Sequence, residues 1–308
     1  MDSLLYILAR ALIALLQALP LTWVARIGRL GGALAFQIDA RHRRVTLRNL
    51  LMCLGHEKTH PEIRALAREN FRRIGENFAC AVKTAGMTFE QVQPFVEFSV
   101  PTLELPSGDG PPPGLVAAIG HFGNFELYAR FGQFAPAYKC ATTYRGLRQP
   151  SLDRLLQSLR NRSGCRFFER RFEAAALKAF MNQPGVVLGL LADQHAGPGG
   201  LRLPFFGHDC STSAAPALFA LRYRFMLLPA FCFRVGLARW RIESGARIAT
   251  HENGRPRSTE AIMLEVNRAF EAAVRRDPAN WFWVHNRWKL MSSPEFKAQR
   301  PDAGPKSA

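Results

Sequence analysis

The sequence has few acidic residues and no closely paired cysteines. Only 24 aspartates and glutamates oppose 41 lysines and arginines, which leaves a net charge of +17. Such an excess attracts a polyanion, and nucleic acid, anionic lipid headgroups and an acidic carrier protein all fit. The six cysteines are scattered without a C-x-x-C pair, which excludes a zinc knuckle or a thioredoxin-type motif. We therefore expect reduced cysteines, most of them small buried hydrophobic residues.

The sequence also lacks internal repeats, low-complexity tracts and a phosphate-binding loop. Its hydrophobic fraction of 48% is that of a globular protein, and 308 residues can bury a core in one or two domains. The glycine-rich stretch from Asp193 to Gly200 has neither the G-x-G-x-x-G order nor the lysine of a P-loop. It predicts instead a turn after a strand, where Asp193 is available for a site or for hydrogen bonds to its own backbone.

The N-terminal segment is the one long apolar run. From Leu4 to Ala25 it is interrupted mainly by Arg10 and Pro20, and its length is close to the roughly 20 residues of a membrane-spanning helix. Asp2 stands where a signal peptide has basic residues, which argues against cleavage. We therefore predict a membrane anchor over residues 1–25, either spanning the bilayer or lying in its interface, with an ordinary buried helix as the alternative.

Six arginines follow this run between residues 26 and 48. By the positive-inside rule, such a flank places the body of the protein in the cytoplasm. Residues 26–105 predict helices and a linker, and the helical rhythm is clearest from Pro61 to Val82.

Residues 106–291 have the pattern of a catalytic α/β domain. Short apolar runs alternate there with helical segments, which predicts an α/β fold with a mostly parallel sheet flanked by helices. The expected strands cover residues 114–120, 138–143, 186–192, 225–233 and 239–249. Residues 292–308 have no periodicity and predict a flexible tail.

His121 stands directly after the first expected strand, in Gly120-His-Phe-Gly-Asn-Phe-Glu126. In open α/β sheets, functional groups gather beyond the carboxyl ends of the strands. We expect Asn124 to cap the following helix and Glu126 to lie in its first turn, where the carboxylate reaches back to one ring nitrogen of His121. The other nitrogen would then face outward as a base for an alcohol. The alternative is a hydrogen-bonded loop histidine and a glutamate that complements a helix dipole.

A histidine followed after four residues by an acid is the signature of glycerolipid and lipid A acyltransferases. The chain resembles more specifically the late, or secondary, acyltransferases of lipid A biosynthesis, in the lysophospholipid-acyltransferase-like superfamily. The resemblance runs from the N-terminal segment through Lys289. The motifs that carry it, besides His121 and Glu126, are Arg43–Leu50, Tyr144-Arg145, Asp193-Gln194, Pro204–Gly207 and Trp281–Lys289.

This resemblance implies an O-acyltransferase on the cytoplasmic face of a bacterial inner membrane. Its acyl donor would be acyl carrier protein charged with a fatty acid, its acceptor a hydroxyl of a lipid A precursor, and no cofactor or metal would be needed. His121 would be the general base, with Glu126 as its partner.

The resemblance also implies residues that bind the substrates. Tyr144 and Arg145 match directly, and Arg160 is a further match for which Arg162 competes. Asp193 and Gln194 would line the acceptor side, where His195 departs from the tyrosine or acid that the family pattern suggests. The set of substrate-binding residues is thus Tyr144, Arg145, Arg160, Asp193 and Gln194.

Two other functions fit parts of the sequence. The same chemistry could serve a different lipid acceptor, such as a phosphatidylinositol mannoside, a lysophospholipid or an aminolipid. The aromatic and basic segment Trp281–Lys289 could stack on single-stranded nucleic acid, lie at a membrane interface, or simply pack against the catalytic domain. Because no recognised nucleic-acid-binding motif accompanies the charge, we expect no nucleic-acid partner.

Overall fold

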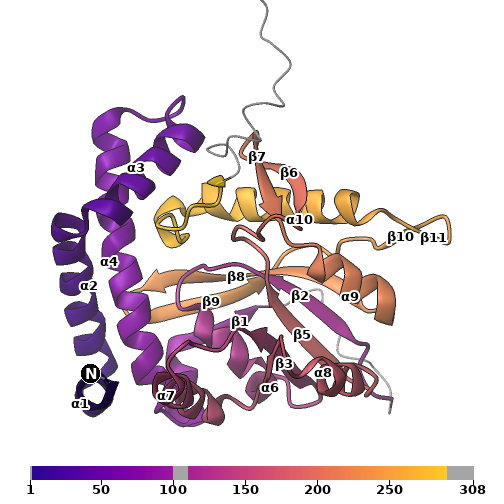
Figure 1. The fold of residues 1–308 in the computed structure, drawn as a ribbon, viewed down its shortest axis with the longest axis horizontal. Coiled ribbons are helices and arrows are strands. Elements are labelled where there is room, and N and C mark those ends of the chain that lie inside the picture. Colours follow the sequence, from indigo (N-terminus) through magenta and orange to yellow (C-terminus); the bar gives the residue numbers. More distant parts are fainter. Residues whose placement is uncertain (1, 100–109, 290–308) are drawn as a thin grey trace, which may run out of the picture.

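A computed structural model describes residues 2–99 and 110–289 of the chain. The tail predicted at 292–308 lies outside the described residues. The first part of the chain is helical, and the second part contains most of the sheet (Figure 1).

Four helices dominate the N-terminal part: α1 (Asp2–Ala18), α2 (Leu21–Ile38), α3 (Ala40–Leu54) and α4 (His60–Ala85). The capping box of Thr59 and Glu62 begins α4, which confirms the helix predicted from Pro61. Helices α2 and α4 lie side by side (Figure 1). Their backbones touch, since a Cβ on Gly75 would lie 2.1 Å from the Gly28 carbonyl oxygen. This close approach packs α2 directly against α4.

The N-terminal membrane anchor is not supported in the form in which the sequence predicts it. The apolar run is divided at Pro20 into α1 and α2, because proline fixes its own backbone and cannot donate the helical hydrogen bond. Among residues 2–99 and 110–289, no helix is long and apolar enough to cross a membrane.

A seven-stranded sheet forms the centre of the fold, in the order β1-β9-β8-β2-β5-β3-β4. Strands β8, β2, β5, β3 and β4 run parallel, β9 is antiparallel to β8, and β1 pairs in parallel with β9. The predicted, mostly parallel α/β sheet is therefore confirmed. The strands are β1 (Val96–Ser99), β2 (Leu115–Ile119), β3 (Lys139–Tyr144), β4 (Arg166–Glu169), β5 (Val186–Leu191), β8 (Met226–Gly236) and β9 (Arg239–Ser244).

The five expected strands correspond to β2, β3, β5, β8 and β9, but four features of the fold were not predicted. Strand β1 comes from the segment assigned to helices and linker, and β4 follows an amphipathic helix. Two hairpins, β6–β7 and β10–β11, add to the seven strands. Their bounds are β6 (Leu201–Phe205), β7 (His208–Thr212), β10 (His251–Glu252) and β11 (Arg255–Pro256).

Helices cover the sheet and complete the core. On one face, α9 packs on β2 and β8, and α10 packs on β8 and β6, over a core that includes Val116 and Ala118 of β2. The opposite face is covered in part by η2 and α6. The bounds of these shorter elements are α5 (Phe89–Val92), η1 (Gln93–Phe95), η2 (Phe125–Arg130), α6 (Phe131–Phe134), α7 (Pro150–Arg160), η3 (Asn161–Ser163), α8 (Ala174–Met181), α9 (Ala215–Tyr223), α10 (Thr259–Arg276) and η4 (Pro278–Asn280).

Candidate active site

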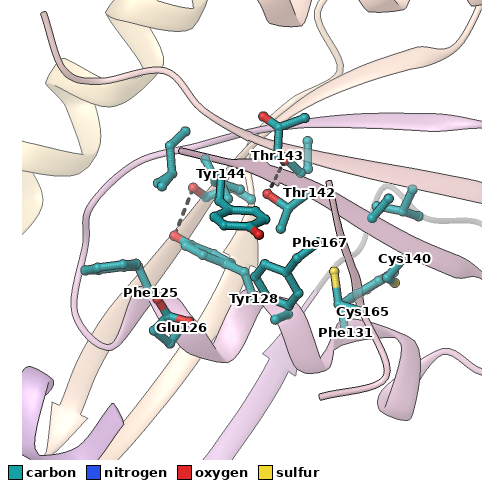
Figure 2. A pocket seen from close by; sticks show the side chains of 18 of the residues that line it. Phe125, Glu126, Tyr128, Phe131, Cys140, Thr142, Thr143, Tyr144, Cys165 and Phe167 are labelled. Atoms are coloured by element: carbon teal, nitrogen blue, oxygen red, sulfur yellow. Dashed lines mark hydrogen bonds between the residues drawn. The ribbon is translucent and has the colours of Figure 1, made fainter. Parts of the chain in front are cut away.

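A cavity of about 600 Å³ lies on the face of the sheet beneath η2 and α6. Side chains alternate along a strand, so Leu115, Ala117 and Ile119 of β2 face this cavity while Val116 and Ala118 face the core. Small residues leave the space open: Ala117 pairs with Gly189 of β5 in the register. Figure 2 shows aromatic and threonine side chains around the cavity, with the Thr142 hydroxyl donating to the Gly189 carbonyl.

His121 lines this cavity at the carboxyl end of β2. The turn that carries it requires a glycine, because Gly123 has a φ of +50° and a Cβ there would lie 2.5 Å from the Cys232 carbonyl oxygen. The Gly123 N–H donates to the Asn280 carbonyl oxygen at 3.1 Å. The imidazole packs edge-on against Phe125 and stacks on Phe282. These contacts fix the direction in which the histidine side chain leaves the turn.

Asp193 is the hydrogen-bond partner of His121. It follows β5, next to β2 in the sheet, and Nδ1 of His121 lies 2.7 Å from its Oδ1. The backbone N–H of His121 and the indole N–H of Trp281 both donate to Oδ2, at 2.7 and 2.8 Å.

Asp193 remains ionised in this setting. Its side chain is 1% exposed, and burial raises the pKa of the carboxyl, but the charge of His121 and the three hydrogen bonds outweigh burial and lower it below the usual value. An ionised carboxylate at Nδ1 keeps the proton on that nitrogen, so Nε2 is the free acceptor. Within the described residues, Nε2 makes no hydrogen bond of its own.

The predicted pairing of Glu126 with the His121 ring is wrong. Glu126 lies in η2, a 3₁₀ helix, and both of its oxygens accept from Arg160, at 2.6 Å from Nη2 and 3.1 Å from Nε. Asn124 does not cap this helix with its side chain as expected. The reason is the strand order. Strand β5 lies next to β2, so its carboxyl end brings Asp193, 72 residues away in the sequence, to the His121 ring.

Five of the predicted site residues besides His121 surround the same cavity: Glu126, Tyr144, Arg145, Arg160 and Gln194. The Arg160 guanidinium lies 4.7 Å from the Phe167 ring centroid and 6.0 Å from that of Tyr144.

The competing Arg162 instead donates to the Gly86 carbonyl oxygen at the end of α4. The structure therefore places Arg160, and not Arg162, in the cavity wall.

Gln194 and His195 also line the cavity, next to the buried Arg287. Arg287 donates to the carbonyl oxygens of Gln194 and Ser211, at 2.5 and 2.8 Å, and to the Thr212 hydroxyl. In the described part of the chain it makes no ion pair with a carboxylate, and burial lowers its pKa. Arg287 thus holds the loop after β5 through hydrogen bonds that it donates to neutral oxygen atoms.

The segment Trp281–Lys289 is a packed element of the catalytic domain. Trp281, Trp283 and Trp288 are 1%, 0% and 4% exposed, so their rings are not available to stack on bases or to lie among lipid headgroups. Their indole N–H groups donate to Asp193, to the Pro278 carbonyl and to the Phe205 carbonyl respectively. The contact of Trp281 with the site was not predicted, because it depends on the pairing of Trp281 with Phe122 across the fold.

Among the described residues, no group of three or more histidine, cysteine, aspartate and glutamate side chains is placed to hold a metal ion. Burial lowers the pKa of two other histidines in this region, His195 in the cavity wall and His285, the latter to about 4. The His121 imidazole, held by a buried carboxylate, can thus accept a proton at the cavity beside the fixed Arg160 guanidinium.

Comparison with known families identifies a matching family for this chain. The sequence model described as bacterial lipid A biosynthesis acyltransferase matches residues 2–290 of the 308-residue chain. No curated protein matches the sequence. Because this match covers nearly the whole chain, the chain belongs to the bacterial lipid A biosynthesis acyltransferases, a family of acyl-transferring enzymes.

Proposed function

We propose that the protein transfers a fatty acyl chain from acyl carrier protein to a hydroxyl of a lipid A precursor, with His121 as the general base. The observation that supports this most directly is the position of His121, whose Nδ1 is tied to the buried Asp193 while its ring lines an apolar cavity. The cavity floor of strand residues such as Leu115, Val187 and Leu228 suits an unbranched acyl chain.

In the proposed reaction, Nε2 of His121 takes the proton from the acceptor hydroxyl as its oxygen attacks the thioester carbonyl carbon. The tetrahedral intermediate collapses, the carbon–sulfur bond breaks, and the thiolate of the carrier arm takes the proton from the imidazolium. The products are the new ester and the free thiol. Asp193 stabilises the imidazolium between these two proton transfers.

Glu126 has a different role in this proposal from the one that its spacing suggests. Its two hydrogen bonds hold the Arg160 guanidinium at the cavity wall. A fixed guanidinium there can donate its remaining N–H groups to the carbonyl oxygen on which negative charge develops. Glu126 would thus act on the reaction through Arg160.

An exposed basic surface beside the cavity supports an acidic carrier as the donor. It is formed by exposed arginines that make no ion pair in the described structure and by two exposed apolar side chains, Leu147 (48% exposed) and Phe172 (82%). The arginines are Arg145, Arg148, Arg154, Arg170 and Arg171. Arg145 and Arg170 also line the cavity, so a carrier docked here would be next to the place where its acyl arm enters.

Reversing the charge of two of these arginines is expected to weaken the binding of the acyl donor. In the double variant Arg148→Glu and Arg171→Glu, the KM for acylated carrier protein should rise by about tenfold or more, with kcat little changed, because both side chains lie outside the cavity. The measurement is steady-state kinetics at low and high salt. A small acyl-pantetheine donor and the Arg255→Glu variant are the controls, and neither should show the effect. An unchanged KM would remove this docking surface from the proposal.

We further propose that α1 and α2 lie in the interface of the bacterial inner membrane, with the catalytic part on its cytoplasmic face. Both helices expose apolar side chains at helical spacing: Leu5, Leu8, Leu12 and Leu15 on α1, and Trp23, Ile27, Leu30, Leu34 and Ile38 on α2. An apolar stripe of this kind, accompanied by arginines, is typical of helices that lie in the membrane plane.

Polar substitutions in this stripe should reduce membrane binding. The double variant Leu30→Gln and Leu34→Gln is expected to lower partitioning into vesicles of phosphatidylethanolamine and phosphatidylglycerol by about 100-fold or more, since each buried leucine contributes roughly 1.5–3 kcal/mol and about 1.4 kcal/mol is tenfold. Co-sedimentation with vesicles measures this. Leu218→Gln on α9 is the matched control, because Leu218 is 53% exposed but lies outside the stripe. Equal binding of all three proteins would contradict the interfacial placement.

A competition assay tests the donor and the acceptor together. The purified protein receives acylated carrier protein and acyl-coenzyme A, each with a lipid A precursor and a lysophospholipid, and the lipid products are identified by mass spectrometry. We expect one ester on the lipid A precursor, formed from the carrier-bound chain. If the acyl chain were transferred to the lysophospholipid alone, the proposed acyl transfer would stand, but the proposed acceptor would be wrong.

A further inference from the structure

Asp193 is held by three N–H groups, and one of them comes from a part of the chain that the proposed mechanism does not use. We propose that Trp281 is a positioning residue of the acyl-transfer site, which holds Asp193 and through it the base His121. This inference rests on the proposed role of His121. It assigns to Trp281 no contact with either substrate, because Trp281 is not among the residues that line the cavity.

The three hydrogen bonds are distributed over the two oxygens of the Asp193 carboxylate. Oδ2 accepts the indole N–H of Trp281 at 2.8 Å and the backbone N–H of His121 at 2.7 Å, while Oδ1 faces Nδ1 of the imidazole at 2.7 Å. With two donors on Oδ2, the carboxylate cannot rotate without breaking both. Oδ1 is thereby reserved for the ring, which is the arrangement that leaves Nε2 free as a base.

Trp281 is itself fixed by the surrounding fold. Its backbone pairs with Phe122, one residue after the base, and its ring packs edge-on against Trp283 at a centroid distance of 4.7 Å. The side chain of Asn70 on α4 donates to the carbonyl oxygens of Ala279 and Trp281, at 2.9 and 2.6 Å. The indole N–H is therefore held in place before any substrate binds.

Other ionisable groups near Asp193 do not replace this donor. Tyr128 donates its hydroxyl to the Ala230 carbonyl oxygen, and Arg287 donates to neutral acceptors on and around β7. His285 lies close enough for the charge of Asp193 to act on its pKa but makes no side-chain hydrogen bond to that carboxylate. Among the described residues, only His121 and Trp281 donate hydrogen bonds to the Asp193 carboxylate.

The test compares two tryptophans of one segment. Trp281→Phe removes the indole N–H from Asp193, whereas Trp283→Phe removes an equally buried indole whose N–H donates to the Pro278 carbonyl oxygen at 2.7 Å. Both variants lose the same atoms from the core, so they control each other for destabilisation. Incorporation of benzothienylalanine at position 281, which keeps the ring volume but lacks the N–H, serves if Trp281→Phe does not fold.

In Trp281→Phe, we expect kcat to fall by about 10-fold or more, the effect of losing one hydrogen bond to a charged group. The KM for acylated carrier protein should stay the same. With one donor fewer, the negative charge of Asp193 is less neutralised and stabilises the His121 imidazolium more strongly. The imidazolium then loses its proton at higher pH, so the rise of kcat/KM with pH on the acidic side of the profile should move to higher pH. Trp283→Phe keeps an aromatic ring against Trp281 and leaves the Trp281–Asp193 hydrogen bond in place, so kcat, KM and the position of that limb should stay unchanged.

A readout without substrate separates this inference from the proposed function. The Nδ1–H proton resonance of His121, followed by NMR in histidine-labelled protein, should move in Trp281→Phe and not in Trp283→Phe. If it moves but the wild-type protein transfers no acyl chain, the positioning holds and the proposed function fails. If wild-type activity is present and the resonance and the acidic limb are alike in all three proteins, Trp281 does not position Asp193.

Discussion

Replacing Asp193 with asparagine is expected to lower kcat for acyl transfer by about 10³- to 10⁴-fold, the loss seen when the aspartate of a Ser-His-Asp triad becomes asparagine. The substitution keeps the size and the buried position of the side chain. Its single carbonyl oxygen can satisfy the Trp281 and backbone donors on Oδ2, which turns the amide NH₂ toward Nδ1 of His121. Nδ1 must then accept, the proton moves to Nε2, and the base is lost.

Glu126→Gln is the matched control for this prediction. Glutamine keeps an acceptor oxygen for Arg160 and makes no contact with the imidazole, so kcat should fall by only about tenfold, the effect of one charged hydrogen bond. The rates are measured under single-turnover conditions, with thermal melting to verify that each variant is folded. If Glu126→Gln were as inactive as Asp193→Asn, the glutamate and not the aspartate would be the partner of the base.

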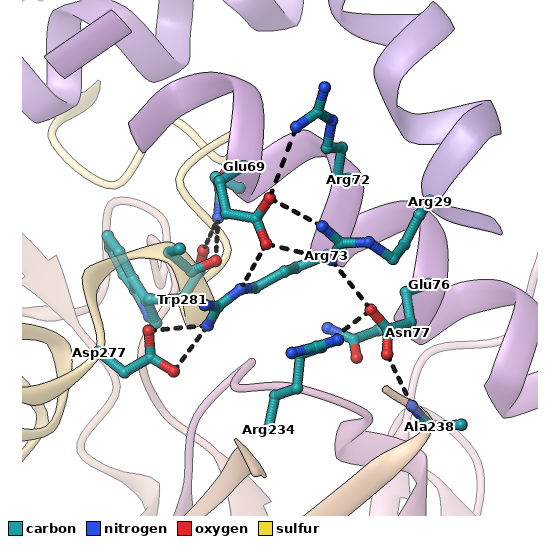
Figure 3. Close-up of polar contacts among 12 residues, drawn as sticks. Arg29, Glu69, Arg72, Arg73, Glu76, Asn77, Arg234, Ala238, Asp277 and Trp281 are labelled. Carbon is teal, nitrogen blue, oxygen red and sulfur yellow. Dashed lines mark hydrogen bonds and ion pairs between the residues drawn. The ribbon is translucent and has the colours of Figure 1, made fainter. Parts of the chain in front are cut away.

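Glu76→Ala is expected to destabilise the protein by about 3–5 kcal/mol, because it removes a fully buried carboxylate and leaves the mostly buried Arg234 without its anion. Glu76 lies on α4 with its side chain fully buried, and it binds Arg29 of α2 and Arg234 of β8, at 3.2 and 2.9 Å (Figure 3). It also accepts the backbone N–H of Ala238 at 2.9 Å. One carboxylate therefore connects the N-terminal helices to the sheet.

Urea denaturation measures this effect, and Glu69→Ala is the control. Glu69 is 30% exposed. After the change Arg29 keeps Glu76 and Arg73 keeps Asp277, while the third partner, Arg72 at 4.0 Å, is 50% exposed (Figure 3). We therefore expect Glu69→Ala to cost about 1 kcal/mol or less, as for other solvent-accessible pairs. Equal costs for both variants would show that burial of Glu76 does not dominate the network.

The sequence predicts the central strands well because they are buried on both faces. Strands β2 and β5 are continuous apolar runs next to glycines, a pattern that only a buried strand or helix produces. The two edge strands, β1 and β4, are not predicted from such apolar runs. β1 reads Val-Glu-Phe-Ser and β4 reads Arg-Phe-Phe-Glu, and short strands of mixed polarity are not distinguished from loops by periodicity.

In the candidate site, too, the contacts between residues close in sequence are predictable and those between distant residues are not. The position of His121 after a strand follows from the local pattern, and the structure places it at the carboxyl end of β2. Its partner depends on the strand order, which puts β5 and Asp193 beside β2 and which no local pattern contains. Glu126 was the nearest acid in the sequence, but the 3₁₀ geometry of η2 and the attraction of Arg160 direct it elsewhere.

The most direct test of the account is the mass of the lipid product formed by wild-type protein and by His121→Ala. With acylated carrier protein and a lipid A precursor, the wild-type protein should add the mass of one acyl ester, and His121→Ala should add none while remaining folded and bound to vesicles. An unmodified lipid with the wild-type protein, or full acylation by His121→Ala, would contradict acyl transfer by this histidine.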